Sequence, residues 1–307
     1  MLPDVAIRVH CEQPALRHAA ETWLTASRLL PSLPLDVNIS VTDEAWAGED
    51  RRQVLRQPLL TYYYGAPDQY LRLVWRDGLG HAVVAPGATS ADVAVVRSLA
   101  EQPETWLRPF LLAVVTALLR RVGWNHIHAA TAVDPAGRGW LIAGDAGSGK
   151  STTAALLARQ GWGVGTDDTA FLVDGASPVE ALAWREPIAL REGGYDLLRL
   201  HGGLALPRRG KTGFFPEELG GRWVATVVPD VIAIAALHDG PTRLESLRAT
   251  LAVADLLSWS LLFIVEPEGA QRHLELVTRL AAQARCYRLL LGRDIFAHRN
   301  LLMELAR

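Results

Sequence analysis

The chain has 307 residues, of which 50% are hydrophobic and 21% are charged. This composition excludes an intrinsically disordered protein and allows one large or two ordinary domains, each with a hydrophobic core. Lysine and arginine number 31 against 33 aspartates and glutamates, a formal charge of −2, and no long basic run stands beside aromatic residues, so we expect no nucleic-acid partner.

The cysteines and the apolar runs predict the cellular compartment of the protein. Cys11 and Cys286 match no metal-binding or redox spacing, so we expect reduced thiols in the cytoplasm. The N-terminal residues lack the apolar core of a secretory signal. The longest apolar runs, Leu111–Leu119 and Leu256–Val265, are shorter than the ~20 residues of a membrane span. We therefore expect both runs in the core of a soluble protein that has no membrane partner.

Residues 1–122 form the first predicted domain, a β-rich α+β segment. Short strand-like runs alternate there with turn signals such as GAPD and RDGLG. An amphipathic helix is predicted over Glu104–Gly123, entered near Pro109 and ended by Gly123. The segment carries no catalytic motif, and we expect it to recognise a substrate or a partner.

Residues 123–307 form the second predicted domain. Its first predicted elements are a strand at His126–Val133, a hairpin turn in 134–139, a strand at Gly139–Gly144, a helix at Ser151–Gln160 and a strand at Gly161–Leu172. Residues 184–200 predict a strand and a helix, 207–221 a long basic loop, and 227–237 a buried strand that is followed mostly by helices. Because a hairpin leads directly into the strand before the first helix, the order favours a mixed sheet.

The stretch GDAGSGKST, residues 144–152, fits the pattern G-x-x-x-x-G-K-[ST]. Its glycines let backbone N–H groups converge on phosphate oxygens, Lys150 adds a positive charge, and the Ser151 hydroxyl can ligate Mg²⁺. A strand before the loop and a helix after it place the loop at a helix N-terminus, which favours an anion. We expect Lys150 on an exposed loop. The candidate ATP-binding residues are Gly144, Asp145, Ala146, Gly147, Ser148, Gly149, Lys150, Ser151 and Thr152.

Two acidic and two histidine residues are candidates for chemistry at this loop. Asp167 and Asp168 follow it at the distance typical of a Mg²⁺ partner. Neighbours on a strand point to opposite faces unless the strand ends there, so we expect one to accept a proton and the other to contact Mg²⁺ or its water. His126 and His128 share a face of their strand, either as packing residues or as metal ligands, although no third ligand has suitable spacing.

The segment HAATAVDPAGRGWLIAGDAGSGKSTTAALLARQGWGVGTDD, residues 128–168, resembles the catalytic core of HPr serine kinase and its relatives. In that family a strand with a histidine runs through a hairpin into the phosphate loop, and a helix, a glycine and a strand ending in Asp-Asp follow. The resemblance is close over residues 124–172 and looser from there to Arg307.

The resemblance implies an α/β fold with a P-loop-containing, mixed-sheet core of the type shared by HPr kinase and ATP-dependent phosphoenolpyruvate (PEP) carboxykinase. By position it implies that His128 is an active-site histidine and that Lys150 and Ser151 contact the nucleotide and Mg²⁺. It also implies that the Asp pair contains the proton acceptor and its partner, with Asp168 favoured as the acceptor. Ser151 and Asp167 are then the expected metal ligands.

The chain departs from the HPr kinases proper after the Asp-Asp strand, because residues 186–198, EPIALREGGYDLL, do not fit the signature L-E-x-R-G-x-G. This region is closer to the shorter HPr-kinase-related enzymes of ribosomal peptide modification, including kinases of lasso peptides. His126 has no counterpart in the family and is expected to pack. Further candidates, either as Mg²⁺ and phosphate contacts or as solvated loop charges, are Glu186, Arg191, Glu192, Arg208, Arg209 and Lys211.

Together these features predict a kinase that depends on ATP and Mg²⁺. We expect it to transfer the γ-phosphoryl group to a hydroxyl, first of all a serine of a peptide or protein, including a ribosomally made natural-product peptide. A small-molecule kinase with the same core and a nucleotide-dependent binding protein without phosphotransfer are the alternatives. The sequence is compatible with a homo-oligomer and does not identify the acceptor.

Overall fold

The computed structural model describes residues 5–26, 33–48, 52–65, 70–174, 178–206, 210–260, 265, 269–298 and 301–306. Contacts divide the chain into two compact units, Met1–Asn125 with Leu262–Ala270, and His126–Leu261 with Gln271–Arg307. The domain boundary that the sequence suggests, between residues 122 and 123, stays a prediction. No helix among the described residues is long and apolar enough to cross a membrane.

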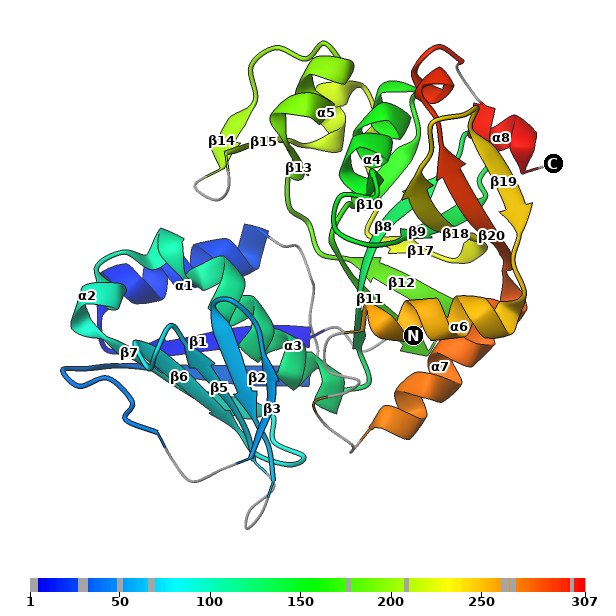
Figure 1. Ribbon diagram of the computed structural model, residues 1–307. Helices are drawn as coiled ribbons and strands as arrows, with labels where there is room; N and C mark the ends of the chain where they lie inside the picture. The colour runs from blue at the N-terminus through cyan, green and yellow to red at the C-terminus, as the bar shows by residue number, and fades with distance from the viewer. Residues whose placement is uncertain are drawn as a thin grey trace. The chain divides into compact units, whose positions relative to one another are not determined.

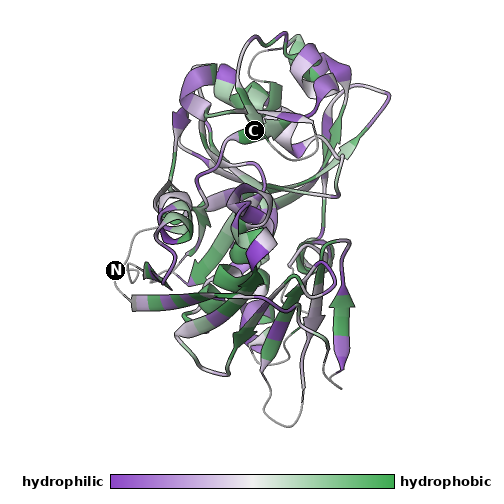
Figure 2. Cartoon of the chain, turned by 90° about the vertical axis from the view of Figure 1, so that its left-hand side faces the viewer, coloured by the Kyte–Doolittle hydropathy of each residue, from purple (hydrophilic) through white to green (hydrophobic). Residues whose placement is uncertain are grey.

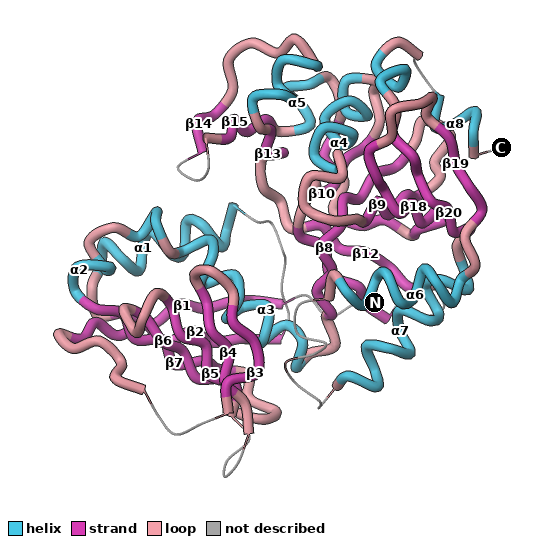
Figure 3. The backbone as a smooth tube through the Cα atoms, in the orientation of Figure 1, coloured by secondary structure: helices cyan, strands magenta, loops and turns pink. Residues whose placement is uncertain are grey.

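The first unit is built on a seven-stranded sheet in the order β1-β2-β7-β6-β5-β4-β3 (Figure 3). Strands β1, β2 and β7 run parallel to one another, and each of the remaining pairs is antiparallel. The strands are β1 Val5–Cys11, β2 Leu33–Thr42, β3 Gln53–Arg56, β4 Leu60–Tyr63, β5 Leu71–Trp75, β6 Gly80–Val84 and β7 Ser90–Val96.

Helices cover one face of this sheet. The helical segments are α1 Pro14–Ala26, α2 Arg97–Ala100, η1 Pro103–Thr105, η2 Leu107–Leu111 and α3 Leu112–Arg121. Helix α1 packs against β1 and α3 against β6 and β7, on the same side of the sheet (Figure 1). Along β6 and β7, buried residues alternate with more exposed ones, and bands of green and purple alternate on strands of this unit (Figure 2). This alternation is typical of a sheet with one covered and one open face.

The long helix predicted over Glu104–Gly123 is wrong in its first half. A 3₁₀ turn and a π-helical turn occupy residues 103–111, and regular α-helix begins only at Leu112. Pro109 lies in the π-helical turn, and because proline has no N–H it cannot make the regular helical hydrogen bond. The apolar run Leu111–Leu119 is buried except for the partly buried Leu112, which confirms its place in the core. Of the run Leu256–Val265, both ends are buried and residues 261–264 lie outside the described residues.

The second unit contains a mixed sheet in the order β17-β12-β11-β8-β9-β18-β20-β19, with β10 and β16 attached beside β8. Strands β8 and β9 form an antiparallel hairpin, whereas β9, β18 and β20 run parallel. The mixed α/β architecture is therefore confirmed. The strands are β8 Asn125–Val133, β9 Gly139–Ala143, β10 Gly163–Thr166, β11 Thr169–Asp174, β12 Val179–Ala183, β16 Arg222–Trp223, β17 Thr226–Val227, β18 Pro229–Leu237, β19 Arg243–Ser246 and β20 Arg285–Leu291.

Helices lie on both faces of this sheet. They are α4 Lys150–Arg159, α6 Ala249–Ser258, α7 Ala270–Gln283, η4 Arg293–Phe296 and α8 Leu301–Leu305. Figure 1 shows α4 on one face, and α6 and α7 on the other. On the central strand β9, Trp140 and Ile142 pack into the cluster below α4, while Leu141 and Ala143 pack into the cluster with α6 and α7. A strand buried on both faces explains the continuous apolar run GWLIA.

A small three-stranded sheet lies outside the main sheet, in the order β13-β15-β14. It consists of β13 Ile188–Leu190, β14 Leu204–Leu206 and β15 Lys211–Phe214, and it is accompanied by α5 Glu192–Leu197 and the 3₁₀ turn η3 Pro216–Leu219. The prediction of one long basic loop over residues 207–221 is wrong for residues 211–219, because Lys211–Phe214 pairs with two strands. Of that segment, Pro207, Arg208 and Arg209 lie outside the described residues.

Candidate functional site

The glycine-rich stretch forms a loop between β9 and α4. Gly144, Gly147 and Gly149 have φ angles of 153°, 88° and 96°, which side chains other than glycine rarely adopt. A Cβ on Gly144 would also lie 2.6 Å from the Ala235 carbonyl oxygen. Gly149 caps the helix, and α4 starts at Lys150. The sequence predicts this strand-loop-helix order correctly.

Lys150 is buried at the start of α4, 6% exposed, so the expectation of an exposed lysine is wrong. Its Nζ donates hydrogen bonds to the carbonyl oxygens of Gly144 at 2.6 Å and Asp145 at 3.0 Å. Burial lowers the pKa of Lys150, and the nearby carboxylates of Asp168, Asp145 and Asp167 oppose this shift. The ammonium group is thus held over the loop by the loop's own carbonyls.

The other loop residues differ in exposure. Asp145, Ala146 and Gly147 are exposed, whereas Ser151 and Thr152 are partly buried in the first turn of α4. The Ser148 hydroxyl is buried and has no hydrogen-bond partner among the described residues. An unpaired polar group of this kind costs free energy unless a ligand or a solvent molecule completes its hydrogen bonding.

The two aspartates lie in a break between strands. Strand β10 ends at Thr166 and β11 begins at Thr169, so a single strand over Gly161–Leu172 is not what the chain forms. The Thr166 hydroxyl accepts hydrogen bonds from the backbone N–H groups of Asp168 at 3.2 Å and Thr169 at 3.1 Å. These bonds fix a bend in which Asp167 and Asp168 enter different surroundings.

Asp167 points into the protein and is 3% exposed. It forms a side-chain hydrogen bond with Ser151 and accepts another from the Ala189 N–H at 3.3 Å. Burial and the neighbouring Asp168 raise the pKa of Asp167, and its hydrogen bonds with Ser151 and Ala189 and the positive charge of Lys211 oppose the rise. The hydroxyl of the loop and a buried carboxylate are therefore in direct contact.

Asp168 is paired with a histidine at the surface of the second unit. Its Oδ1 lies 3.0 Å from His128 Nδ1, and the two side chains are 37% and 34% exposed. The His128 backbone N–H donates to the Trp259 carbonyl, and the Trp259 indole Nε1 donates to Asp145 Oδ1 at 3.0 Å. Trp259 thus links the histidine strand to the loop, a contact that no local sequence signal indicates.

His126 lies two residues before His128 on β8 but has a different environment. Its Nδ1 is buried without a hydrogen-bond partner among the described residues, and its ring meets Phe171 edge-on at 5.8 Å between centroids. Burial, followed by the nearby His128, lowers the pKa of His126 to about 4, while Asp168 opposes the shift. A neutral, enclosed ring fits the packing role expected for His126.

Among the further candidates, Lys211 lies near the loop. Its positive charge lowers the pKa values of both Asp167 and Lys150. Arg191 and Glu192 are exposed, and Glu186 is partly buried. Arg208 and Arg209 fall outside the described residues. Lys211 is therefore the further candidate that contributes to the electrostatics of the loop.

A cavity of about 480 Å³ opens beside the loop. Two of its apolar walls, Leu237 and Leu197, are 68% and 51% exposed. The polar residues His238, Asp239 and Arg293 also line it. Sequence reasoning missed this cavity because its walls come from the ends of α5, β18 and β20 and the residues after the two strands, so no local pattern marks it.

Comparisons with known proteins add little to this geometry. No family model and no curated protein matches the chain. Among solved structures, the HPr(Ser) kinase/phosphatase from Coxiella burnetii aligns with 58% of this chain and 98% of its own length, at 14% identity and a TM-score of 0.28. A likeness this weak carries no argument about activity, which must be drawn from the residues of the site.

Proposed function

We propose that the protein is a kinase that uses ATP and Mg²⁺ to phosphorylate a hydroxyl, specifically a serine of a peptide or protein. The observation that carries this proposal is the division of the aspartate pair at the glycine-rich loop. Asp167 contacts Ser151 inside the protein, and Asp168 contacts His128 at the surface. Phosphoryl transfer to a hydroxyl needs charge neutralisation on one side and a proton acceptor on the other.

The loop and Lys150 would bind the phosphates. The N–H groups at the start of α4 and the helix dipole favour an anion there. Ser151 and Asp167 would hold Mg²⁺, because a hydroxyl and a carboxylate are the oxygen ligands this ion takes alongside phosphate and water. When bound, the ion would neutralise charge on the phosphate oxygens.

Asp168 would serve as the proton acceptor. The acceptor hydroxyl oxygen forms a bond to the γ-phosphorus as the bond from that phosphorus to the oxygen of the leaving ADP breaks, and the hydroxyl proton passes to an Asp168 carboxylate oxygen. His128 would hold the carboxylate in position through its 3.0 Å contact. Asp168 is accessible to an incoming substrate, since 37% of its side chain is exposed, whereas Asp167 is enclosed.

The cavity beside the loop supports a nucleoside triphosphate over a smaller phosphate compound. It contacts Gly147, Gly149 and Thr152 of the loop and first turn, so a ligand held there by its phosphates would place its nucleoside in the cavity. The exposed leucines Leu197 and Leu237 offer apolar contact to a planar base. Covering such side chains with a ligand removes apolar surface from water.

The test is transfer of label from γ-labelled ATP to a panel of serine peptides, free serine and pyruvate-like acids, with and without Mg²⁺. We expect labelled phosphoserine in peptides, with loss of labelling in Asp168→Asn. Asp174→Asn is a matched control, because Asp174 pairs with Arg279 on the surface. Label on free serine alone would instead identify a small-molecule kinase. Tight ATP binding without any transfer would refute the kinase and favour the binding protein.

A further inference from the structure

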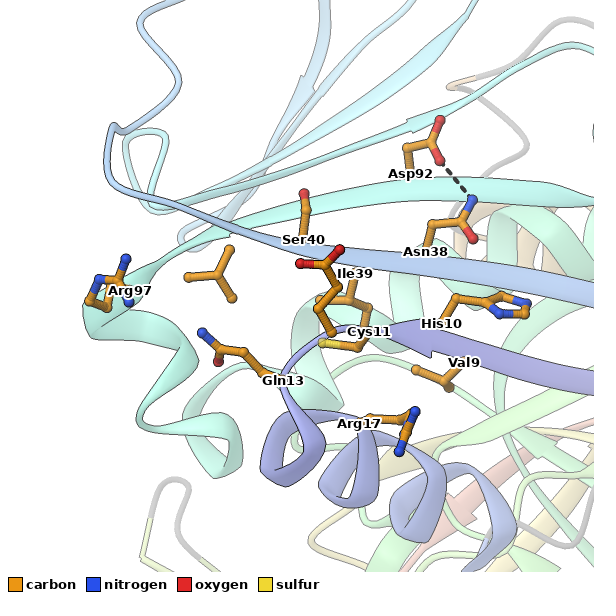
Figure 4. Close-up of a pocket in the computed structure, with 12 residues that line it drawn as sticks. Val9, His10, Cys11, Gln13, Arg17, Asn38, Ile39, Ser40, Asp92 and Arg97 are labelled. Carbon is orange, nitrogen blue, oxygen red and sulfur yellow. Dashed lines mark hydrogen bonds between the residues drawn. The ribbon is translucent and has the colours of Figure 1, made fainter.

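A second cavity, of about 870 Å³, lies in the first unit and is lined by residues of that unit (Figure 4). It opens where the parallel strands β1, β2 and β7 end and where α1 and α2 begin. Figure 4 shows Asn38 and Asp92 on one side and Arg17 of α1 on the opposite side. Ligands of parallel sheets commonly bind outside the carboxyl ends of the strands. The place and the size of the cavity both suit a ligand.

The edge of the sheet contains a notch at this cavity. Pairing between β1 and β2 ends at Cys11 and Ile39, but pairing between β2 and β7 continues to Thr42 and Val96. The chain turns away from the sheet after Cys11, so the last residues of β2 have a neighbouring strand on one side only. The open side of β2 faces the cavity through Val41.

Val41 presents an unused backbone donor and acceptor at this notch. The Asp36 N–H donates to the carbonyl oxygen of Thr89, the residue before β7, so the even-numbered residues of β2 direct their backbone groups towards β7. Because the backbone groups alternate along a strand, Val41 directs its own towards the β1 side. No described residue makes a hydrogen bond with the Val41 N–H or carbonyl. Such a free strand edge is a template for another extended chain.

From this arrangement we infer that the cavity binds a short extended peptide, which continues the line of β1 and forms strand hydrogen bonds with Val41. The charges around the notch suit such a ligand. Arg17 and Glu12 line the cavity, and no described residue forms an ion pair with either of them. A peptide can offer an acidic group to Arg17 and a basic group to Glu12, in addition to its backbone.

The other charged residues of the cavity are already satisfied. Arg97 donates two hydrogen bonds to Asp43, at 2.9 and 3.1 Å, and Asp92 accepts one from Asn38 at 2.8 Å. A simple anion such as phosphate would be attracted by Arg17 but repelled by the carboxylate of Glu12. The mixed charges and the free backbone groups therefore favour a peptide.

Cys11 provides a direct assay, because this free thiol lines the cavity and is partly exposed, whereas Cys286 is buried. The rate of Cys11 alkylation by iodoacetamide is measured by mass spectrometry, without nucleotide, in the presence of a positional-scanning library of acetylated hexapeptide amides. We expect a subset of pools to slow the alkylation. Acidic residues at one position and basic residues at another should be preferred, and Arg17→Ala and Glu12→Gln should remove these two preferences.

Val41→Pro decides the proposal, because it removes the Val41 N–H, to which no described residue is hydrogen-bonded. The binding of the selected peptides should weaken about tenfold, as expected for one lost backbone hydrogen bond. Val41→Thr, which keeps the N–H, should bind like the parent, and equal melting temperatures would show that both variants fold. Protection by no pool, equal protection in Val41→Pro, or protection by phosphate alone would overturn the proposal. Since no ATP is present, these outcomes are independent of the proposed kinase activity.

Discussion

The cavity of the first unit and the cavity beside the glycine-rich loop occupy equivalent places in two different sheets. In the first unit the cavity lies outside the ends of the parallel strands β1, β2 and β7, and in the second it lies outside the ends of β9, β18 and β20. In each, a strand passes through a loop into a helix, β1 into α1 and β9 into α4. In both units the cavity therefore lies outside the carboxyl ends of parallel strands, where such sheets commonly bind ligands.

The loop that follows the strand differs between the units. After β9 the loop contains Gly144, Gly147 and Gly149 at positive φ and ends at Lys150. After β1, Glu12 and Gln13 lead directly to the helix, without glycine and with an acidic side chain. Glycines allow backbone N–H groups to converge on an anion, whereas the second arrangement leaves the strand edge of β2 open. The comparison teaches that the two units share a cavity position in their sheets but differ in the glycine content and charge of the loop beside it.

The largest expected effect is on the chemistry of the second unit. Asp168→Asn should lower kcat about 10²–10⁴-fold, the usual contribution of a general base, with ATP affinity kept. Asp167→Asn should weaken the binding of ATP in the presence of Mg²⁺ as well, because it removes the carboxylate beside Ser151. Steady-state kinetics and titration calorimetry measure both. If the two variants lost activity and affinity in the same proportion, the division of roles between the aspartates would be wrong.

A second prediction separates the two cavities. If the proposed function holds, Lys150→Ala should lower kcat/KM for phosphotransfer about 10²–10³-fold, because it removes a positive charge held over the glycine-rich loop. The same variant should keep the full protection of Cys11 by peptides, since Cys11 and its cavity belong to the first unit. Lys211→Ala is the control, because it removes a nearby positive charge that is not in the loop. The activity of this variant should fall less than that of Lys150→Ala. Loss of peptide protection in Lys150→Ala would show that the two cavities are not independent.

Local sequence patterns predicted much of the site. The glycine spacing of the loop, the hairpin before it and the helix after it depend on residues close together in the chain, and all three are present. The strand pattern alone continues across the break at the Asp pair, and only the resemblance implied a strand that ends there. The Thr166 hydroxyl, which fixes the bend, carries no distinct signal. Likewise the burial of Lys150 depends on how the loop folds back over its ammonium group.

Features assembled from distant segments could not be predicted. The Trp259 contact with Asp145 joins residues 114 positions apart, and the cavity beside the loop takes its walls from four separate segments. In the first unit, individual strands were recognisable, but the parallel order of β1, β2 and β7 was not. Strand order depends on contacts between segments far apart in the sequence, and local propensity does not report these.

The smallest expected effects are on stability, and they have opposite signs in the two units. Burial raises the pKa of Asp167, so the folded state disfavours its ionised form at neutral pH. Asp167→Asn keeps an oxygen that can accept hydrogen bonds from Ser151 and Ala189, and should raise the melting temperature at pH 7 by about 2–4 °C, the shift that 1 kcal/mol gives in a unit of this size. The gain should shrink as the pH falls towards the ordinary aspartate pKa, near 4.

Asp36, on strand β2 of the first sheet, should behave in the opposite way. Hydrogen bonds from Arg8 and His10 lower the pKa of Asp36, so its ionised form stabilises the fold above the ordinary aspartate pKa, and this stabilisation is lost as the pH falls through the lowered value. Asp36→Asn should therefore lower the melting temperature slightly at pH 7 and have no effect in strong acid, because a pair this exposed contributes little. Thermal unfolding of Asp167→Asn, Asp36→Asn and the parent from pH 3 to pH 8 tests both predictions. Stabilisation by Asp36→Asn at pH 7, or destabilisation by Asp167→Asn in a variant that still folds, would contradict the description of Asp167 as a buried carboxylate with a raised pKa and of Asp36 as a paired carboxylate with a lowered pKa.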